Sequence, residues 1–109
     1  MRPVRISYLL PVLLAACAII PGNYEGKSGE RTVRVTLKPD GFAALSTMFS
    51  DRATRFLSEG KWVEEGGRIR LDLEGQTLVF QRRGDELVAR EWDRAVWGEQ
   101  GPGALQQVW

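Results

Sequence analysis

The stretch TVRVTLKPDGFAALSTMF, residues 32–49, decides the fold class of this 109-residue chain. Its first part alternates apolar and polar side chains, which is the period of a strand with one buried face. Residues 39–41 (PDG) follow with the types that a tight turn favours, because proline fixes φ, aspartate hydrogen-bonds locally and glycine accepts a positive φ. The apolar run 42–49 is a second strand, so the stretch predicts a β-hairpin.

The same pattern continues along the chain in shorter units. Further strands, separated by polar or glycine-containing turns, are predicted at 54–63, 68–73, 77–83 and 87–92. A short strand near 23–25 and a closing strand at 104–109 would raise the number to eight. Strands at roughly ten-residue spacing are typical of an all-β antiparallel meander that closes as a barrel or a sandwich. No stretch of helical period is long enough to compete.

Residues 1–16 have the composition of a secretory signal peptide. The chain begins with Arg2 and Arg5 and no acid, and the apolar run 6–16 follows. At about eleven residues this run is too short for a membrane span, which needs roughly twenty. We therefore expect an exported protein whose signal is removed.

The signal ends at the only cysteine of the chain. Residues Leu14, Ala15, Ala16 and Cys17 resemble the lipobox of bacterial lipoproteins, in which the cysteine is acylated and the signal is removed before it. The alternative is a lone buried thiol, which is the ordinary state of a free cysteine. Because several acyl chains such as palmitate form a stable anchor, the lipobox predicts lipidation at Cys17 and attachment to a membrane.

The residue types leave little room for catalysis. The chain has no histidine, and acylation would occupy its one cysteine, which excludes histidine-dependent nucleophilic sites and the common zinc sites. The acidic pairs Glu64-Glu65 and Asp85-Glu86 fall in predicted turns, where adjacent acids are ordinarily solvated. We therefore expect no enzyme activity, no catalytic residues, no metal and no cofactor.

Two further functions find no support in the sequence. Loss of Arg2 and Arg5 with the signal would leave acidic residues in slight excess, which gives no electrostatic case for binding nucleic acid. The segment GKS at 26–28 is not a phosphate-binding loop, because Pro21 stands where that motif needs glycine.

Aromatic residues are the remaining candidates for a binding surface. Inward positions, with side chains that fill the core, are expected for Phe42, Phe56, Trp62 and Phe80. The tryptophans of the last third lie among glycines that interrupt the strand pattern. They either plug one end of the barrel or form an exposed binding surface; these residues are Trp92, Trp97 and Trp109. The sequence assigns no ligand-binding residues.

A family resemblance is carried by turn and core residues spread over most of the chain after the signal. They are the PDG turn at 39–41, Gly60 with Trp62, Ile69 with Leu71, and Gly84, Asp85 and Leu87. In this pattern, and in its ending WGEQGPGALQQVW, the chain is similar to the N-terminal domain of the NlpE family of envelope lipoproteins. The resemblance implies a small lipocalin-like β-barrel on the outer membrane.

The chain departs from the better-known members of that family at one motif. Their C-x-x-C pair, linked to copper and envelope-stress sensing, has no counterpart in residues 23–31. Met48 is the only methionine after the signal, so soft ligands for Cu(I) are missing as well. Copper binding is therefore not expected.

The lipobox and the strand pattern together define the expected organisation and location. We expect a signal peptide at 1–16, the lipidated cysteine and a tether at 17–30, and a single β-barrel domain at 31–109. Ala18, directly after the cysteine, offers no charge that would retain a lipoprotein at the inner membrane. The expected location is therefore the outer membrane, with the domain facing the periplasm.

The expected function is that of a non-enzymatic lipoprotein with an NlpE-like role in envelope maintenance or stress sensing, exerted through contacts with an unidentified envelope protein. One alternative is a lysozyme inhibitor, because residues 58–62 weakly resemble the S-G-x-x-Y-type loop of such proteins. Another is a carrier of a small apolar ligand inside the barrel, although the inward Phe and Trp residues favour a filled interior.

Overall fold

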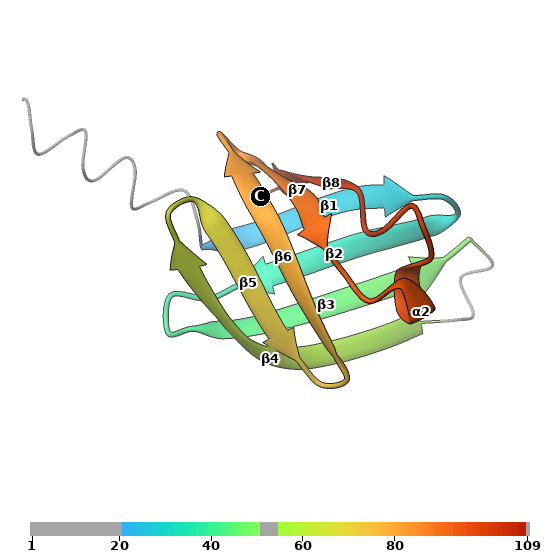
Figure 1. Ribbon diagram of the computed structural model, residues 1–109, viewed down its shortest axis with the longest axis horizontal. Helices are drawn as coiled ribbons and strands as arrows, with labels where there is room; N and C mark the ends of the chain where they lie inside the picture. Colours follow the sequence, from blue (N-terminus) through green and yellow to red (C-terminus); the bar gives the residue numbers. More distant parts are fainter. Residues whose placement is uncertain (1–20, 51–54, 109) are drawn as a thin grey trace, which may run out of the picture.

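The computed structural model describes residues 21–50 and 55–108, most of which lie in antiparallel strands (Figure 1). Eight strands pair in chain order within these residues, and the first also pairs with the last, so the sheet closes on itself. The strands are β1 (Gly22–Ser28), β2 (Arg31–Leu37), β3 (Phe42–Phe49), β4 (Arg55–Glu65), β5 (Arg68–Leu73), β6 (Gln76–Arg83), β7 (Glu86–Glu91) and β8 (Ala104–Val108). One short helix, α2 (Arg94–Trp97), precedes β8. The predicted all-β antiparallel barrel is confirmed.

The hairpin predicted from residues 32–49 forms β2 and β3. The N–H of Gly41 donates to the carbonyl of Lys38 at 3.0 Å, which closes the turn. The N–H of Phe42 donates to the Asp40 carboxylate at 3.0 Å. Gly41 has a φ of 96°, which a side chain would strain, so the glycine is required here.

Inward side chains of the strands form one core. Its two fully buried aromatic residues are Tyr24 and Phe80. The other buried strand residues in the cluster are aliphatic: Val33, Val35, Leu37, Ala43, Leu45, Ile69, Leu71, Leu73, Leu78, Leu87 and Leu105. Because burying one large apolar side chain stabilises by about 1.5–3 kcal/mol, this cluster is the main source of stability in the described part of the chain.

β4 changes its partner along its length. Its first half pairs with β3 and its second half with β5, and Gly60 belongs to both ladders. A Cβ atom at Gly60 would lie 2.9 Å from the Cα of Leu73 and closer still to the carbonyl oxygen of Asp72. The missing side chain therefore lets the backbones of β4 and β5 approach where the barrel bends.

The two ends of the barrel are built differently. At the N-terminal end β1 begins, and the turns at 39–40, 66–67 and 84–85 lie beside it. The opposite end, which we call the mouth, carries the turns at 29–30 and 74–75 and the helix α2. In Figure 1 the chain enters β1 at the left, and α2 lies at the right.

The short strand expected near residues 23–25 is present as β1, and all seven of its residues pair with β2. The barrel therefore begins before residue 31, inside the segment 17–30 that the sequence assigned to a tether. Tyr24 is the only large apolar residue of β1 and stands between Gly22 and Gly26. The segment therefore lacks the alternation that marks the other strands, although Tyr24 is fully buried.

The core assignments of two phenylalanines are wrong. Phe56 is 60% exposed, because its inward position on β4 lies at the mouth. There the side chain lines a cavity and is not covered by other core residues. Phe42 alternates with the buried Ala43 and therefore faces outward. Phe80 is fully buried as predicted, and Trp62 packs against the core while remaining partly exposed.

Several predictions fall on residues outside those that the structure describes. They concern the lipobox residues Leu14, Ala15 and Ala16, the acylated Cys17, the sorting residue Ala18, and Trp109.

Candidate binding site at the barrel mouth

The helix α2 is a single turn that lies at the mouth. The Asp93 carboxylate caps its start by accepting a hydrogen bond from the N–H of Ala95 at 2.9 Å. Gly98, with a φ of 72°, ends it. The sequence did not predict this helix, because four residues are too few to show a helical period.

Hydrogen bonds attach α2 to the strands. The indole N–H of Trp97 donates to Oε1 of Gln76 on β6 at 2.8 Å. Nη1 of Arg31, the first residue of β2, donates to the carbonyl of Val96 at 3.2 Å. These contacts fix the helix against two different strands and turn the Trp97 side chain into the barrel.

The tryptophans of the last third have different surroundings. Trp97 is 4% exposed and plugs part of the barrel end, which is one of the two roles that the sequence left open. Trp92 packs against the core, and its indole N–H donates to the carbonyl of Gly98 at 2.9 Å. Neither side chain forms the exposed aromatic surface that was the other possibility.

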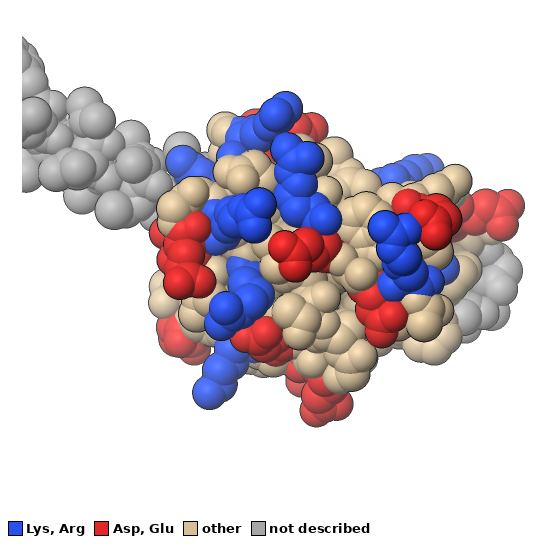
Figure 2. Space-filling view, in the orientation of Figure 1, with Lys and Arg blue, Asp and Glu red and all other residues tan. Residues whose placement is uncertain are grey.

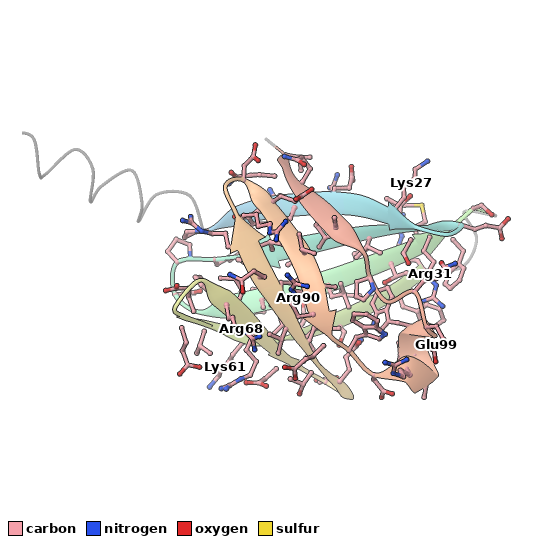
Figure 3. All side chains as sticks on the ribbon, turned by 45° about the horizontal axis from the view of Figure 1, so that its top comes forward. Lys27, Arg31, Lys61, Arg68, Arg90 and Glu99 are labelled. Atoms are coloured by element: carbon pink, nitrogen blue, oxygen red, sulfur yellow. The ribbon has the colours of Figure 1, made fainter. Side chains whose placement is uncertain are left out.

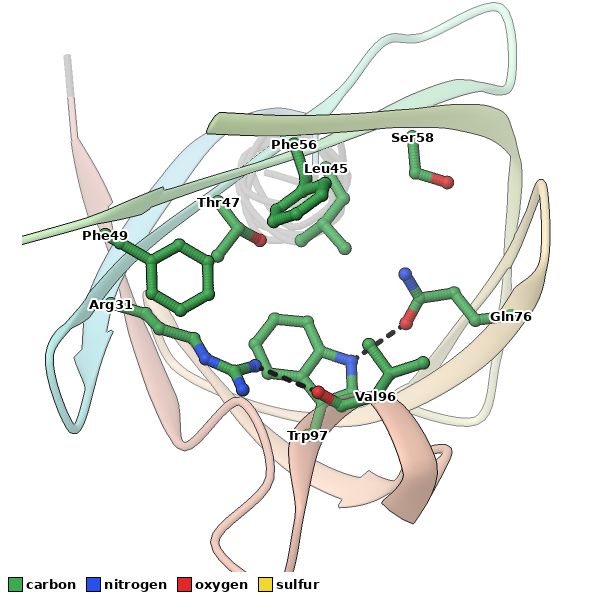
Figure 4. A pocket seen from close by; sticks show the side chains of 9 residues that line it. All are labelled: Arg31, Leu45, Thr47, Phe49, Phe56, Ser58, Gln76, Val96 and Trp97. Atoms are coloured by element: carbon green, nitrogen blue, oxygen red, sulfur yellow. Dashed lines mark hydrogen bonds between the residues drawn. The ribbon is translucent and has the colours of Figure 1, made fainter. Parts of the chain in front are cut away.

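The helix covers only part of the mouth, and a cavity of about 230 Å³ remains beside it (Figure 4). Strands β2, β3, β4 and β6 and the helix all contribute to its wall. Its apolar lining consists of Leu45, Phe49, Phe56, Val96 and Trp97, and its polar lining of Arg31, Thr47, Ser58 and Gln76. This half of the barrel is therefore not filled by its own side chains.

Among the described residues that line this cavity, Arg31 is the charged one. Its guanidinium carbon lies 5.2 Å from the ring centre of Phe49 and 5.1 Å from that of Trp97. Contact with two aromatic faces holds a guanidinium group in place through cation–π attraction. Within residues 21–50 and 55–108 no carboxylate forms an ion pair with Arg31, so its charge is not neutralised by these residues.

Thr47 is the buried polar residue of the lining. Its side chain is on β3 and only 6% exposed, and its hydroxyl faces the cavity (Figure 4). The hydroxyl has no hydrogen-bond partner among the described residues. The oxygen atom is not sealed off from solvent, because Nη1 of Arg82 is the one described side-chain atom that is both buried and without a partner. A ligand or water in the cavity can therefore pair with the Thr47 hydroxyl.

The rim of the mouth carries exposed apolar side chains. Besides Phe56, Leu57 is 64% exposed and Val96 is 42% exposed. Phe56 packs edge to face on Phe49, with ring centres 5.9 Å apart. Three exposed apolar side chains therefore lie at this end of the barrel.

A second polar group lies inside the barrel. Burial raises the pKa of the Tyr24 hydroxyl above its ordinary value of 10.0, and the Arg82 guanidinium partly opposes this effect, while Asp85 adds to it. Nη1 of Arg82 is buried and has no hydrogen-bond partner among residues 21–50 and 55–108.

The outer surface carries charges of both signs. Figure 2 shows basic and acidic side chains interspersed over one face, and Figure 3 places Arg68 and Arg90 on the outer side of the sheet, whereas Arg31 lies near α2. Arg68 pairs with Glu91 at 3.7 Å, and both side chains are exposed. Exposed ion pairs of this kind contribute only about 0–1 kcal/mol.

The acidic pairs noted in the sequence make contacts of a structural kind. Glu64 accepts a hydrogen bond from the N–H of Gly67 at 2.8 Å. Asp85 accepts one from the side chain of Gln106 at 2.8 Å. Residues 58–62, the echo of a lysozyme-inhibitor loop, lie inside β4 and pair with its neighbours, so they form a strand and not a projecting loop.

Comparisons with protein-family models, with curated proteins and with solved structures found no match to this chain. Among the described residues, no three or more His, Cys, Asp or Glu side chains gather where they could hold a metal ion. No helix in the same residues is long and apolar enough to cross a membrane.

Proposed function

We propose that this chain is a non-enzymatic, lipid-anchored lipoprotein of the bacterial envelope that binds a small apolar ligand in the mouth of its barrel. The observation that carries the proposal is the cavity of about 230 Å³ lined mainly by apolar side chains. It is smaller than the roughly 300–1,000 Å³ pockets that hold drug-sized ligands, and larger than the roughly 150 Å³ cavity that holds benzene.

The lipobox and the similarity to NlpE-like proteins support an anchor at Cys17 in the outer membrane, with the domain in the periplasm. Residues 17–21 would then connect the lipid to β1, and they span at most about 18 Å when fully extended. Since β1 begins at the end opposite the mouth, this attachment leaves the mouth open to the periplasm and away from the anchor.

A neutral fluorescent probe tests ligand binding directly. The probe is 1-naphthylamine, which is neutral at pH 7 and whose ten carbons are close to what a cavity of 230 Å³ can hold. It gains fluorescence in apolar surroundings, and we expect this gain when the protein is added. Ser58→Trp should abolish the gain, because Ser58 lines the cavity and a large side chain would fill it. Ser46→Trp, on the outward face of β3, is the matched control and should leave the gain intact. Equal fluorescence with both variants would contradict binding at the mouth.

A second candidate function, contact with an envelope protein, is favoured by the exposed rim. Leu57 is 64% exposed although it is large and apolar. A photo-crosslinking residue at position 57 should capture a discrete partner in intact cells if the rim is an interface. Position 63 is the control, because Val63 is also apolar and exposed but lies toward the other end of β4. Capture that is equal at both positions would argue against a specific interface at the rim.

A further inference from the structure

We infer that the mouth selects ligands that carry a carboxylate group. Arg31 binds the carboxylate, the Thr47 hydroxyl donates a further hydrogen bond to it, and the apolar body lies against Leu45 and Trp97. This inference rests on the proposed function and specifies the chemical class of its ligand.

Arg31 has the charge that such a ligand requires and, as far as the described part of the chain goes, donors that no other residue uses. A guanidinium group has five N–H donors, and one nitrogen of Arg31 bonds to the Val96 carbonyl. The aromatic faces of Phe49 and Trp97 hold the group in place but accept no ordinary hydrogen bond from it. The remaining donors suit the two oxygens of a carboxylate, which arginine binds in a forked geometry.

Thr47 gives an independent indication of a polar ligand atom. The residue is 6% exposed, and its hydroxyl faces the cavity and lacks a partner among the described residues. In the ladder between β2 and β3, Arg31 is opposite Phe49, and Val33 is opposite Thr47. Arg31 and Thr47 are therefore diagonal neighbours on the inner face, roughly 7–8 Å apart at the backbone, and the long arginine side chain can meet a group bound at the hydroxyl.

The cavity volume limits the apolar part of the ligand. A cavity of about 150 Å³ holds the six carbons of benzene, so the 230 Å³ at the mouth suits a body of about nine carbons. Leu45, Phe56 and Trp97 provide apolar contacts along its wall. The ligand class is thus a monocarboxylate with a medium-length alkyl chain or a single aromatic ring.

Octanoate and octanamide form the decisive pair of probes, because they have the same length and differ in charge. Each is titrated into the purified full chain and followed by calorimetry and by the methyl NMR signals of Leu45 and Val96. We expect octanoate to shift these signals and to bind at least tenfold more tightly than octanamide, while Leu71, in the filled part of the core, is unaffected. A titration with 3-phenylpropanoate, whose carboxylate is linked to an aromatic ring, then shows whether the cavity prefers an alkyl or an aromatic body.

Three variants assign the carboxylate to its partners. Arg31→Gln should weaken octanoate binding about tenfold to hundredfold, and octanamide binding by a much smaller factor, because the amide carbonyl loses only a hydrogen bond between a cation and a neutral group. Thr47→Val should weaken octanoate binding roughly threefold to tenfold, since it removes one donor without removing volume. Arg34→Gln is the matched control, because Arg34 is on the same strand but faces outward and pairs with Glu25 at 2.9 Å, so octanoate binding should not change.

The outcomes separate this inference from the function on which it rests. If octanoate and octanamide shift the methyl signals of Leu45 and Val96 with equal affinity, the mouth binds apolar ligands without recognising a carboxylate, and the inference is wrong. If Arg31→Gln retains full octanoate affinity, the inference is also wrong. If neither compound nor the neutral naphthylamine probe binds at the mouth, both proposals fail. Thr47→Val keeps the test valid should Arg31→Gln not fold, because it leaves the contacts between Arg31 and α2 intact.

Discussion

Replacement of Gly60 by alanine tests the idea that the barrel bends where β4 and β5 approach each other most closely. The new Cβ would lie 2.9 Å from the Cα of Leu73 and from the carbonyl carbon of Asp72, and closer still to the carbonyl oxygen of Asp72. All three atoms belong to backbone, so no side chain can rotate away. Relief requires the two strands to separate where Gly60 pairs with Leu73 and Lys61 pairs with Asp72.

The size of the effect follows from two opposing contributions. Overpacking of this kind costs about 1–3 kcal/mol, and a clash with fixed backbone belongs at the upper end. The φ of Gly60 is not positive, so alanine is allowed there and recovers about 0.5 kcal/mol by restricting the unfolded chain. The net loss is about 2.5 kcal/mol, which for a domain of this size lowers Tm by about 10–20 °C.

Thermal unfolding followed by circular dichroism measures this loss. Gly84→Asn is the control, because Gly84 has a φ of 62° with no atom within 4 Å of the Cβ position, and asparagine tolerates that conformation. We expect the control to change Tm by only a few degrees. A Gly60→Ala variant with the wild-type Tm would refute the proposed close approach of the two strands.

Three further predictions concern the core, the buried tyrosine and the anchor. Phe80→Ala should lower the free energy of unfolding in urea by about 3–5 kcal/mol, and Trp62→Ala by less, because Phe80 is fully buried and Trp62 is not; equal losses would contradict this ranking. Burial raises the pKa of Tyr24 above 10.0, so stability is unaffected below pH 10 and falls as the pH rises further, since the unfolded chain loses the proton first. Tyr24→Phe should flatten that fall in alkaline unfolding curves, and an unchanged slope would argue against it. Cys17→Ser should leave an unprocessed, unacylated precursor, and normal processing with tight membrane association of this variant would overturn the lipoprotein proposal.

The sequence predicted the strands well wherever neighbouring residues alone specify them. Residues 32–49 contain an alternating strand, its turn and the returning strand, so no distant contact is needed to recognise the hairpin. β1 was harder, because its pairing with β8 depends on residues at the far end of the chain. Gly26 shows why: a Cβ there would meet the backbone of Ala104, a constraint that appears only when the barrel closes.

Alternation predicts which face a side chain occupies, but it does not predict depth along the barrel. Phe56 occupies an inward position as predicted, and Ser58 lies on the same face of β4, yet both line the mouth and not the core. The helix α2 places Trp97 beside Phe56 and Ser58 and so makes their inward positions part of a cavity wall. The strand pattern alone could not show this, because α2 lies far from β4 in the sequence. The sequence did contain an indication that Arg31 is a site residue. Arg31 stands two residues before Val33, so it lies on the same inward face of the strand, and an inward position is unusual for a charged residue.

The inward positions of β3 show how stability and binding are divided within one strand. Ala43, Leu45 and Thr47 follow one another toward the mouth, and the first two are apolar and buried. A barrel selected only for stability would continue with an aliphatic residue at position 47, because this side chain is only 6% exposed and a methyl group there would add apolar burial that a hydroxyl does not. Proteins break such packing rules chiefly at functional sites. If the hydroxyl is kept for a ligand, Thr47→Val should raise the Tm of the free protein while it weakens octanoate binding, and a variant that loses both would instead assign Thr47 a structural role.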